Sequence, residues 1–247
     1  MSTATLALRF DAPMQSWGVR SRFINRFTAT EPTKSGVVGL LAAALGVERT
    51  DEEAIRRLAD LRMGVRVDRE GLLERDYQVT QDVPNTEEKN HRTVVSHRYY
   101  LADALFLVVL EGPSEELERL EGAVRRPHWP LFFGRKAFVP AAPLVEADER
   151  RRNRYGTGLR PGDLGTVLRE HPWLEDRDRP RAEASRLRAE RLLRTLEDVP
   201  ASHPHAELRR DHPESFSPGD RRFRSRTVRA GHVELTDAMI AGAPPCT

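Results

Sequence analysis

The chain has 247 residues, enough for one large hydrophobic core or two small ones, and no apolar run is long enough to span a bilayer. Its 40 Lys and Arg residues against 38 Asp and Glu residues leave a formal net charge of only +2, which excludes a uniformly basic polyanion binder. The basic residues are instead clustered, and each local cluster can contact a phosphate backbone or simply form a solvated charged face. The clusters lie at residues 19–26, 134–136, 149–154 and 221–229.

The start of the chain shows no signal-peptide pattern, because the first ten residues lack a basic segment, a long apolar stretch and a small-residue cleavage site. The single cysteine, Cys246, has no partner within the chain, so no disulfide framework is expected. These features predict a cytoplasmic protein without a membrane partner.

The first 145 residues show a regular succession of strand and helix patterns. Leu6, Leu8 and Phe10 alternate as in a half-buried strand, and residues 31–46 predict a helix that ends at Gly46. A capping box then begins a second short helix. The later patterns predict, in chain order, a strand at 62–68, a strand at 102–111, a helix at 113–124 and a strand at 136–145.

This order is that of the ferredoxin-like fold, an α+β arrangement in which two helices cover one face of a four-stranded antiparallel sheet. We therefore expect residues 1–145 to form one ferredoxin-like domain whose other sheet face is open to a ligand. A long insertion at about 72–100 has a polar middle between two strand-like stretches. Because a compact domain rarely carries so long a connection without a use for it, the insertion is predicted to be a protruding β-hairpin.

Residues 146–247 are predicted to form a polar C-terminal extension, partly loop and β-rich at its end. An Arg- and Glu-rich stretch at 179–199 is expected to be one exposed helix, and residues 221–235 a terminal strand pair. The segment at 200–220 holds three histidines without regular ligand spacing, so a solvated loop is favoured over a metal site. No metal and no cofactor are expected.

Residues 31–46 place a lysine and small residues before a long apolar run, as phosphate-binding loops often do. A Walker A loop has its glycine-rich segment before the Lys-Ser/Thr pair, whereas here Lys34 and Ser35 precede Gly36, so a nucleoside triphosphate site is not expected. Thr33 or Ser35 can instead cap a helix whose free N–H groups, with Lys34, would bind one phosphate of a nucleic acid strand. The alternative is an ordinary capped core helix with an exposed lysine.

Five sequence motifs occur together in one order. They are DAPMQSWG (11–18), EPTKSGVVGLLAAALG (31–46), RDYQVT (75–80), SHRYYLADALFLVVL (96–110) and PLFFGRKAFVP (130–140). In order and approximate spacing they resemble the CasD family, the subtype I-E members of Cas family five, from about residue 6 to residue 145. The family's common glycine before PMQSWG is Ala12 here, and Gln78 stands where a histidine is frequent, but neither change threatens the fold.

The resemblance implies the RAMP form of the ferredoxin-like fold, with the insertion at 72–100 as its thumb hairpin. It implies an RNA-binding subunit of the type I-E CRISPR surveillance complex, Cascade, which grips the 5′ handle of the crRNA and caps the backbone in antiviral defence. The implied partners are a CasC-type backbone subunit at the thumb and the large subunit CasA near the handle, with target DNA reached only through the complex.

The family resemblance implies a subunit without catalytic residues, because a separate subunit makes the cut in the type I-E system. The alternative is a metal-independent endoribonuclease that processes CRISPR repeat RNA. Such chemistry needs a group that deprotonates the 2′-hydroxyl and a cation beside the reacting phosphate, which Tyr77, His97 and Lys136 would have to supply.

The residues expected to contact RNA come from the motifs and the basic clusters. Gln15 can hydrogen-bond a base edge and Trp17 can offer a stacking face, although a buried Trp at the end of the sheet is the alternative. The glycine before Arg135 and Lys136 lets the backbone approach a phosphate closely. The expected set is Gln15, Trp17, Arg20, Arg26, Lys34, Ser35, Gly36, Tyr77, His97, Arg98, Gly134, Arg135 and Lys136.

Overall fold

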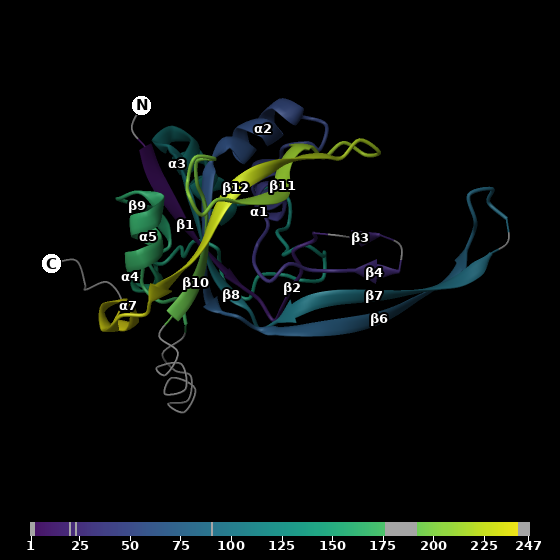
Figure 1. Ribbon diagram of the computed structural model, residues 1–247, viewed down its shortest axis with the longest axis horizontal. Helices are drawn as coiled ribbons and strands as arrows, with labels where there is room; N and C mark the ends of the chain where they lie inside the picture. Colours follow the sequence, from purple (N-terminus) through teal and green to yellow (C-terminus); the bar gives the residue numbers. More distant parts are fainter. Residues whose placement is uncertain (1–2, 20, 23, 90, 176–191, 242–247) are drawn as a thin grey trace.

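The computed structural model describes residues 3–19, 21–22, 24–89, 91–175 and 192–241, and Figure 1 shows its elements. The strands are β1 (Thr3–Asp11), β2 (Met14–Gln15), β3 (Ser21–Arg22), β4 (Asn25–Arg26), β5 (Arg62–Arg69), β6 (Leu72–Val83), β7 (Arg92–Ala102), β8 (Leu105–Pro113), β9 (Gly158–Arg160), β10 (Leu192–Asp198), β11 (Glu207–Ser215) and β12 (Arg222–Glu234). The helices are α1 (Lys34–Leu45), α2 (Glu52–Asp60), α3 (Ser114–Arg125), α4 (Glu149–Tyr155), α5 (Leu164–Glu170) and α7 (Asp237–Ala241). Within the described residues, no helix has both the length and the apolar character needed to cross a membrane.

The ferredoxin-like core predicted from the sequence is confirmed. Four neighbouring antiparallel strands run in the order β9, β1, β8, β5 within a seven-stranded sheet. Leu6, Leu8 and Phe10 of β1 are fully buried in one cluster with apolar residues of α1 and α3. Helix α1 forms there because Thr33 caps its first turn and Gly46, in the left-handed conformation at φ 74°, ends it.

The other face of this sheet is covered, so the expectation of an open face is wrong. Ala7 of β1 packs with Leu164 and Leu168 of α5 in a second buried cluster. Arg66 of β5 is fully buried under the same segment, where it pairs with Asp68 at 2.6 Å and donates to backbone carbonyls at and just after the end of α5. Strand β8 is buried on both faces, which explains its continuous apolar sequence.

The fourth core strand is β9, and the strand expected at 136–145 is wrong. Those residues, all described, contain no strand, although the Ala141 N–H and the Leu144 carbonyl form hydrogen bonds of 2.8 and 2.9 Å with β1. Pro140 and Pro143 have no amide hydrogen, so this stretch cannot continue a ladder.

Strands of the C-terminal region extend the same sheet: β10 pairs with β5, β12 with β10, and β11 with β12. Residues on both sides of the boundary expected after residue 145 therefore share one sheet. The helix expected at 179–199 is wrong for residues 192–198, because pairing with two neighbouring strands overrides the local helix propensity, and its residues 179–191 lie outside the described part. The expected loop at 200–220 contains β11, and the expected strand pair at 221–235 is one long strand, β12, paired with β11.

The insertion between the second and third core strands is the predicted protruding hairpin. Pairing of β6 with β7 runs from Leu72 opposite Ala102 to Val83 opposite Arg92, and Figure 1 shows the hairpin reaching far from the body. At its base β2 and β4 pair with β7, and β3 pairs with β4. The hairpin is therefore joined to a small second sheet where it leaves the core.

Candidate nucleic-acid interface

The base of the hairpin β6–β7 adjoins a pocket of about 490 Å³, which we call the arginine pocket. Its walls come from residues 16–18, β4, the start of α1, β7, residues 134–135 and the segment from the end of β11 to the start of β12. The charged side chains of its lining are all arginines: Arg26, Arg98, Arg135 and Arg221. Among the described residues no carboxylate contributes to the lining, so the pocket concentrates positive charge.

The arginine pocket brings together part of the set expected from the sequence. The members in its lining are Trp17, Arg26, Ser35, Gly36, Arg98, Gly134 and Arg135. Tyr77 and His97 lie outside the lining, on facing strands of the hairpin, with ring centroids 5.7 Å apart. Lys136 is exposed but also outside it, and Arg20 lies outside the described residues.

Arg135 is held in place, although its guanidinium group is not fully hydrogen-bonded. One terminal nitrogen, Nη2, donates to the Tyr99 carbonyl at 2.7 Å, and the group lies 5.2 Å from the centre of the Phe138 ring. The other terminal nitrogen, Nη1, is buried and has no hydrogen-bond partner among the described residues. Burial, and then the charge of Arg98, lower the pKa of Arg135 below its usual value, while Asp76 opposes this. A bound anion would offset the repulsion between Arg135 and Arg98.

Gly134 allows the Arg135 loop to pack against residues 16–18. Its φ is +87°, and a Cβ atom there would lie 1.8 Å from the Ser16 carbonyl oxygen. The Ser16 N–H donates to the Phe133 carbonyl at 3.1 Å, which fixes the two segments side by side. In this structure the close backbone approach that requires glycine is therefore to Ser16.

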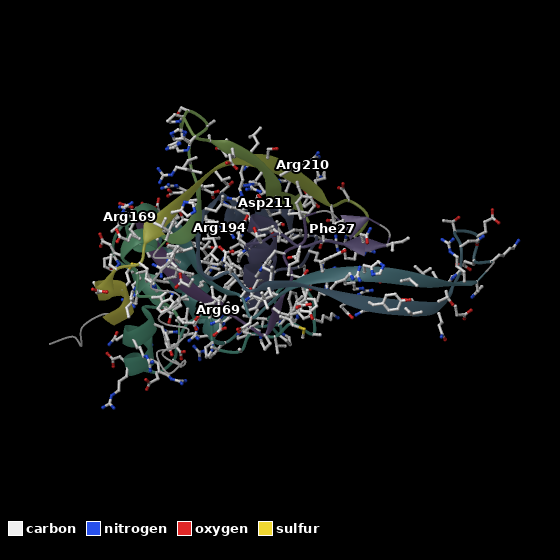
Figure 2. The ribbon with its side chains drawn as sticks, turned by 60° about the horizontal axis from the view of Figure 1, so that its bottom comes forward. Phe27, Arg69, Arg169, Arg194, Arg210 and Asp211 are labelled. Atoms are coloured by element: carbon white, nitrogen blue, oxygen red, sulfur yellow. The ribbon has the colours of Figure 1, made fainter. Side chains whose placement is uncertain are left out.

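The second wall of the arginine pocket comes from strand pairing at the base of the hairpin. Arg26 of β4 is the parallel register partner of Arg98 of β7. Beside them the rings of Phe27 and Tyr99 are stacked with centroids 5.1 Å apart, and Phe27, labelled in Figure 2, is 46% exposed. The wall therefore offers both cations and an aromatic surface.

The start of α1 forms the floor of the arginine pocket. The Gly36 N–H donates to the Thr33 hydroxyl at 3.3 Å. There is no room for a side chain at Gly36, because a Cβ atom added there would lie 2.8 Å from the Trp17 ring. Trp17 is only 1% exposed and its ring stacks on Phe10 at 5.6 Å. The expected stacking of a base on Trp17 is therefore contradicted, since the ring is part of the core.

Lys34 is not a phosphate contact, contrary to the sequence-based expectation. It is 4% exposed, and its Nζ donates to Asp198 at 2.7 Å and to the Leu61 carbonyl at 2.5 Å. Burial lowers the pKa of Lys34 and the charge of Asp198 opposes this. Asp211 of β11, labelled in Figure 2, accepts the Lys34 backbone N–H at 2.8 Å. Acidic residues of the C-terminal strands therefore hold the start of α1.

Gln15 also turns inward. Its side chain is fully buried, and its amide nitrogen donates to the Ala104 carbonyl at 2.7 Å and to the Phe10 carbonyl at 3.2 Å. These bonds connect β2 to the end of β1 and to Ala104, directly before β8. The expected reading of a base edge by Gln15 is contradicted by this burial.

Sequence reasoning did not single out Phe27, Phe216, Arg221 or Phe223, which the structure adds to the arginine pocket. A signal existed for Arg221 and Phe223, because they lie in the basic cluster at 221–229. Nothing in the sequence places that cluster beside the hairpin, since the connection is made by the order of strands in the sheet.

A ferredoxin-like core with a long hairpin between its second and third strands, and an arginine-lined pocket at the hairpin base, defines a protein of the RAMP class. The chain belongs to the CRISPR-associated protein (Cas_Cas5) family, whose model matches residues 5–229. The resemblance seen in the sequence is thereby confirmed, and it extends well beyond residue 145.

Individual relatives agree with this assignment. The chain is 34% identical over 153 residues to the CRISPR system Cascade subunit CasD of Escherichia coli (strain K12), a match covering 56% of this chain and 68% of that protein. It is similar to a chain of a CRISPR RNA-guided surveillance complex, with a TM-score of 0.75, 29% identity and coverage of 98% and 95% of the two chains. A Cas protein crystal structure gives a TM-score of 0.69, 37% identity and coverage of 98% and 100%.

Proposed function

We propose that this chain is a non-catalytic RNA-binding subunit of a type I-E CRISPR surveillance complex, and that its arginine pocket grips the 5′ handle of the crRNA. The observation that carries the proposal is the charge of the pocket. Four arginines from separate segments converge on it without a lining carboxylate, and Arg135 keeps a buried guanidinium nitrogen without a partner in the described structure.

This arrangement suits a bent single strand. Guanidinium groups bind phosphate oxygens through paired N–H donors, and arginines on several walls can contact successive phosphates. The exposed face of Phe27 beside them can stack a base that leaves the strand. The pocket therefore combines a grip on the backbone with one place for an unstacked base.

The hairpin β6–β7 is proposed to pack against a CasC-type backbone subunit. Strand β6 exposes a run of apolar side chains, and an exposed apolar surface of this kind marks a protein contact. They are Leu72, Leu73, Tyr77 and Val79. The large subunit CasA would lie near the handle, and target DNA would be reached through the assembled complex.

The alternative, a metal-independent endoribonuclease, would use Tyr77 and His97, which lie together on the hairpin. The binding proposal is favoured because the charged groups of the pocket lining are four arginines, which bind phosphate but do not accept protons at neutral pH. Incubating the protein with repeat RNA and no metal is expected to leave the RNA intact. Specific cleavage that His97→Ala abolishes would overturn the non-catalytic assignment.

The binding proposal is tested by the salt dependence of handle affinity in the reconstituted complex. Arg98→Ala and Arg135→Ala are each expected to weaken binding and to reduce the magnitude of the salt slope by about 0.7, because each lost phosphate contact no longer releases a counterion. Arg57→Ala is the matched control, since Arg57 lies exposed on α2 and pairs with Glu53 at 2.8 Å. Unchanged slopes in both pocket variants would refute the proposal.

A further inference from the structure

The segment from the end of β11 to the start of β12, residues 215–226, lies beyond the motifs that identify the RNA-binding region in the sequence. In Figure 1 the β11–β12 turn reaches out on the same side of the body as the hairpin β6–β7, with β3 and β4 between them. Phe216, Arg221 and Phe223 of this segment line the arginine pocket. The rings of Phe216 and Phe223 are tilted against each other, with centroids 6.3 Å apart.

Side chains alternate along a strand, so the arginines of this segment divide into two groups that lie on opposite sides. One group pairs with carboxylates of the protein, and the other lines the arginine pocket. Arg222 pairs with Glu52 at 2.8 Å and Arg224 with Asp60 at 3.2 Å, both acids belonging to α2. Further along β12, Arg226 is buried against Asp198 and Asp211. These three arginines are therefore neutralised within the protein and attach β12 to the body.

Arg221 differs from these neighbours. It directly precedes β12, is exposed, and lies in the lining of the arginine pocket together with Phe223, two residues further on. Within the described part of the chain it has no ion pair with a carboxylate. Its charge adds to that of Arg26, Arg98 and Arg135 across the pocket.

We propose that Arg221 binds a phosphate of the RNA strand held in the arginine pocket, so that the β11–β12 segment forms the wall opposite the hairpin. This inference rests on the proposed function. It makes the β11–β12 segment part of the handle site, with the rings of Phe216 and Phe223 as the apolar surface beside the bound phosphate. The ligand chemistry is that of single-stranded RNA: a phosphate at the guanidinium and a sugar or base at the rings.

The test compares Arg221→Ala with Arg222→Ala in the reconstituted complex, by measuring handle-RNA affinity at several salt concentrations. The two arginines are adjacent on one segment, and each substitution removes one charge, so they are closely matched. Arg221→Ala is expected to weaken binding about tenfold and to reduce the salt slope by about 0.7, while Arg221→Lys keeps the slope. Arg222→Ala is expected to keep both the affinity and the slope.

The outcomes separate this inference from the proposed function. If Arg98→Ala and Arg135→Ala lower the slope but Arg221→Ala does not, the wall assigned to β11–β12 is overturned and the pocket assignment stands. If Arg222→Ala lowers the slope as much as Arg221→Ala, the division between paired and free arginines is overturned. If none of the variants changes the slope, the RNA-binding pocket itself is refuted. Thermal unfolding of Arg221→Ala is expected to match that of the unmodified chain, which excludes a loss of fold as the cause.

Discussion

Replacing Lys34 by methionine is expected to destabilise the protein without altering its electrostatic contact with RNA. The ammonium group is buried between Asp198 and the Leu61 carbonyl, and methionine fills a similar volume without donating to either. Asp198 would still accept from the Met63 N–H at 2.9 Å and from Arg226. Because these partners remain, the expected loss lies near the lower end for a broken buried ion pair, about 3 kcal/mol.

Urea unfolding followed by circular dichroism measures this loss, and at 247 residues a change of that size lowers Tm by roughly 6 to 12 °C. Lys136→Met is the matched control, since Lys136 is exposed, and it is expected to change stability by less than about 0.5 kcal/mol. In the salt titration Lys34→Met is expected to keep the slope. A variant with unchanged stability and a slope reduced by about 0.7 would show that Lys34 contacts phosphate and that the reasoning from its burial is wrong.

Gly134→Ala is expected to lower the free energy of unfolding by about 1–3 kcal/mol from its backbone conformation alone, and to weaken handle binding by moving Arg135. Gly18→Ala is the control and is expected to be tolerated, because a Cβ atom at Gly18 meets no atom within 4 Å. Equal stability of the two variants in thermal unfolding would contradict this. Burial, and then the charge of Arg66, lower the pKa of His171 from 6.5 to about 4, although the Pro172 and Gly156 carbonyls beside its ring nitrogens oppose this shift. The unfolded chain therefore binds more protons between these values, and stability falls as pH drops from about 6.5 toward 4, by on the order of 3 kcal/mol. His171→Gln is expected to flatten the dependence of Tm on pH in that window, and an unchanged profile would argue against it. The isolated chain is expected to be only moderately stable and to self-associate through the exposed apolar residues of β6. Light scattering over a concentration series measures this association. A strictly monomeric species at high concentration would count against the hairpin as a protein contact surface.

Three of the four core strands, their two helices and the protruding hairpin could be predicted from the sequence, whereas the fourth core strand, β9, could not. Leu6, Leu8 and Phe10 have the period of a strand with one buried face toward the helices, and Thr33 and Gly46 mark the ends of α1. These signals are local, because each depends on residues that lie close together in the sequence. The family motifs added the class of protein and the general region of the site.

Which basic residues face the pocket depends on contacts between distant parts of the chain. Lys34 and Arg135 both lie within two residues of a glycine in the sequence, yet one is buried against acids and the other keeps an unfilled donor in a pocket. The partner of Lys34, Asp198, is 164 residues away, in a stretch whose composition predicts a helix but which forms a strand beside β5. A residue's charge fixes which interactions it can make, but strand pairing between distant segments fixes which partner it meets, and no local pattern contains that information.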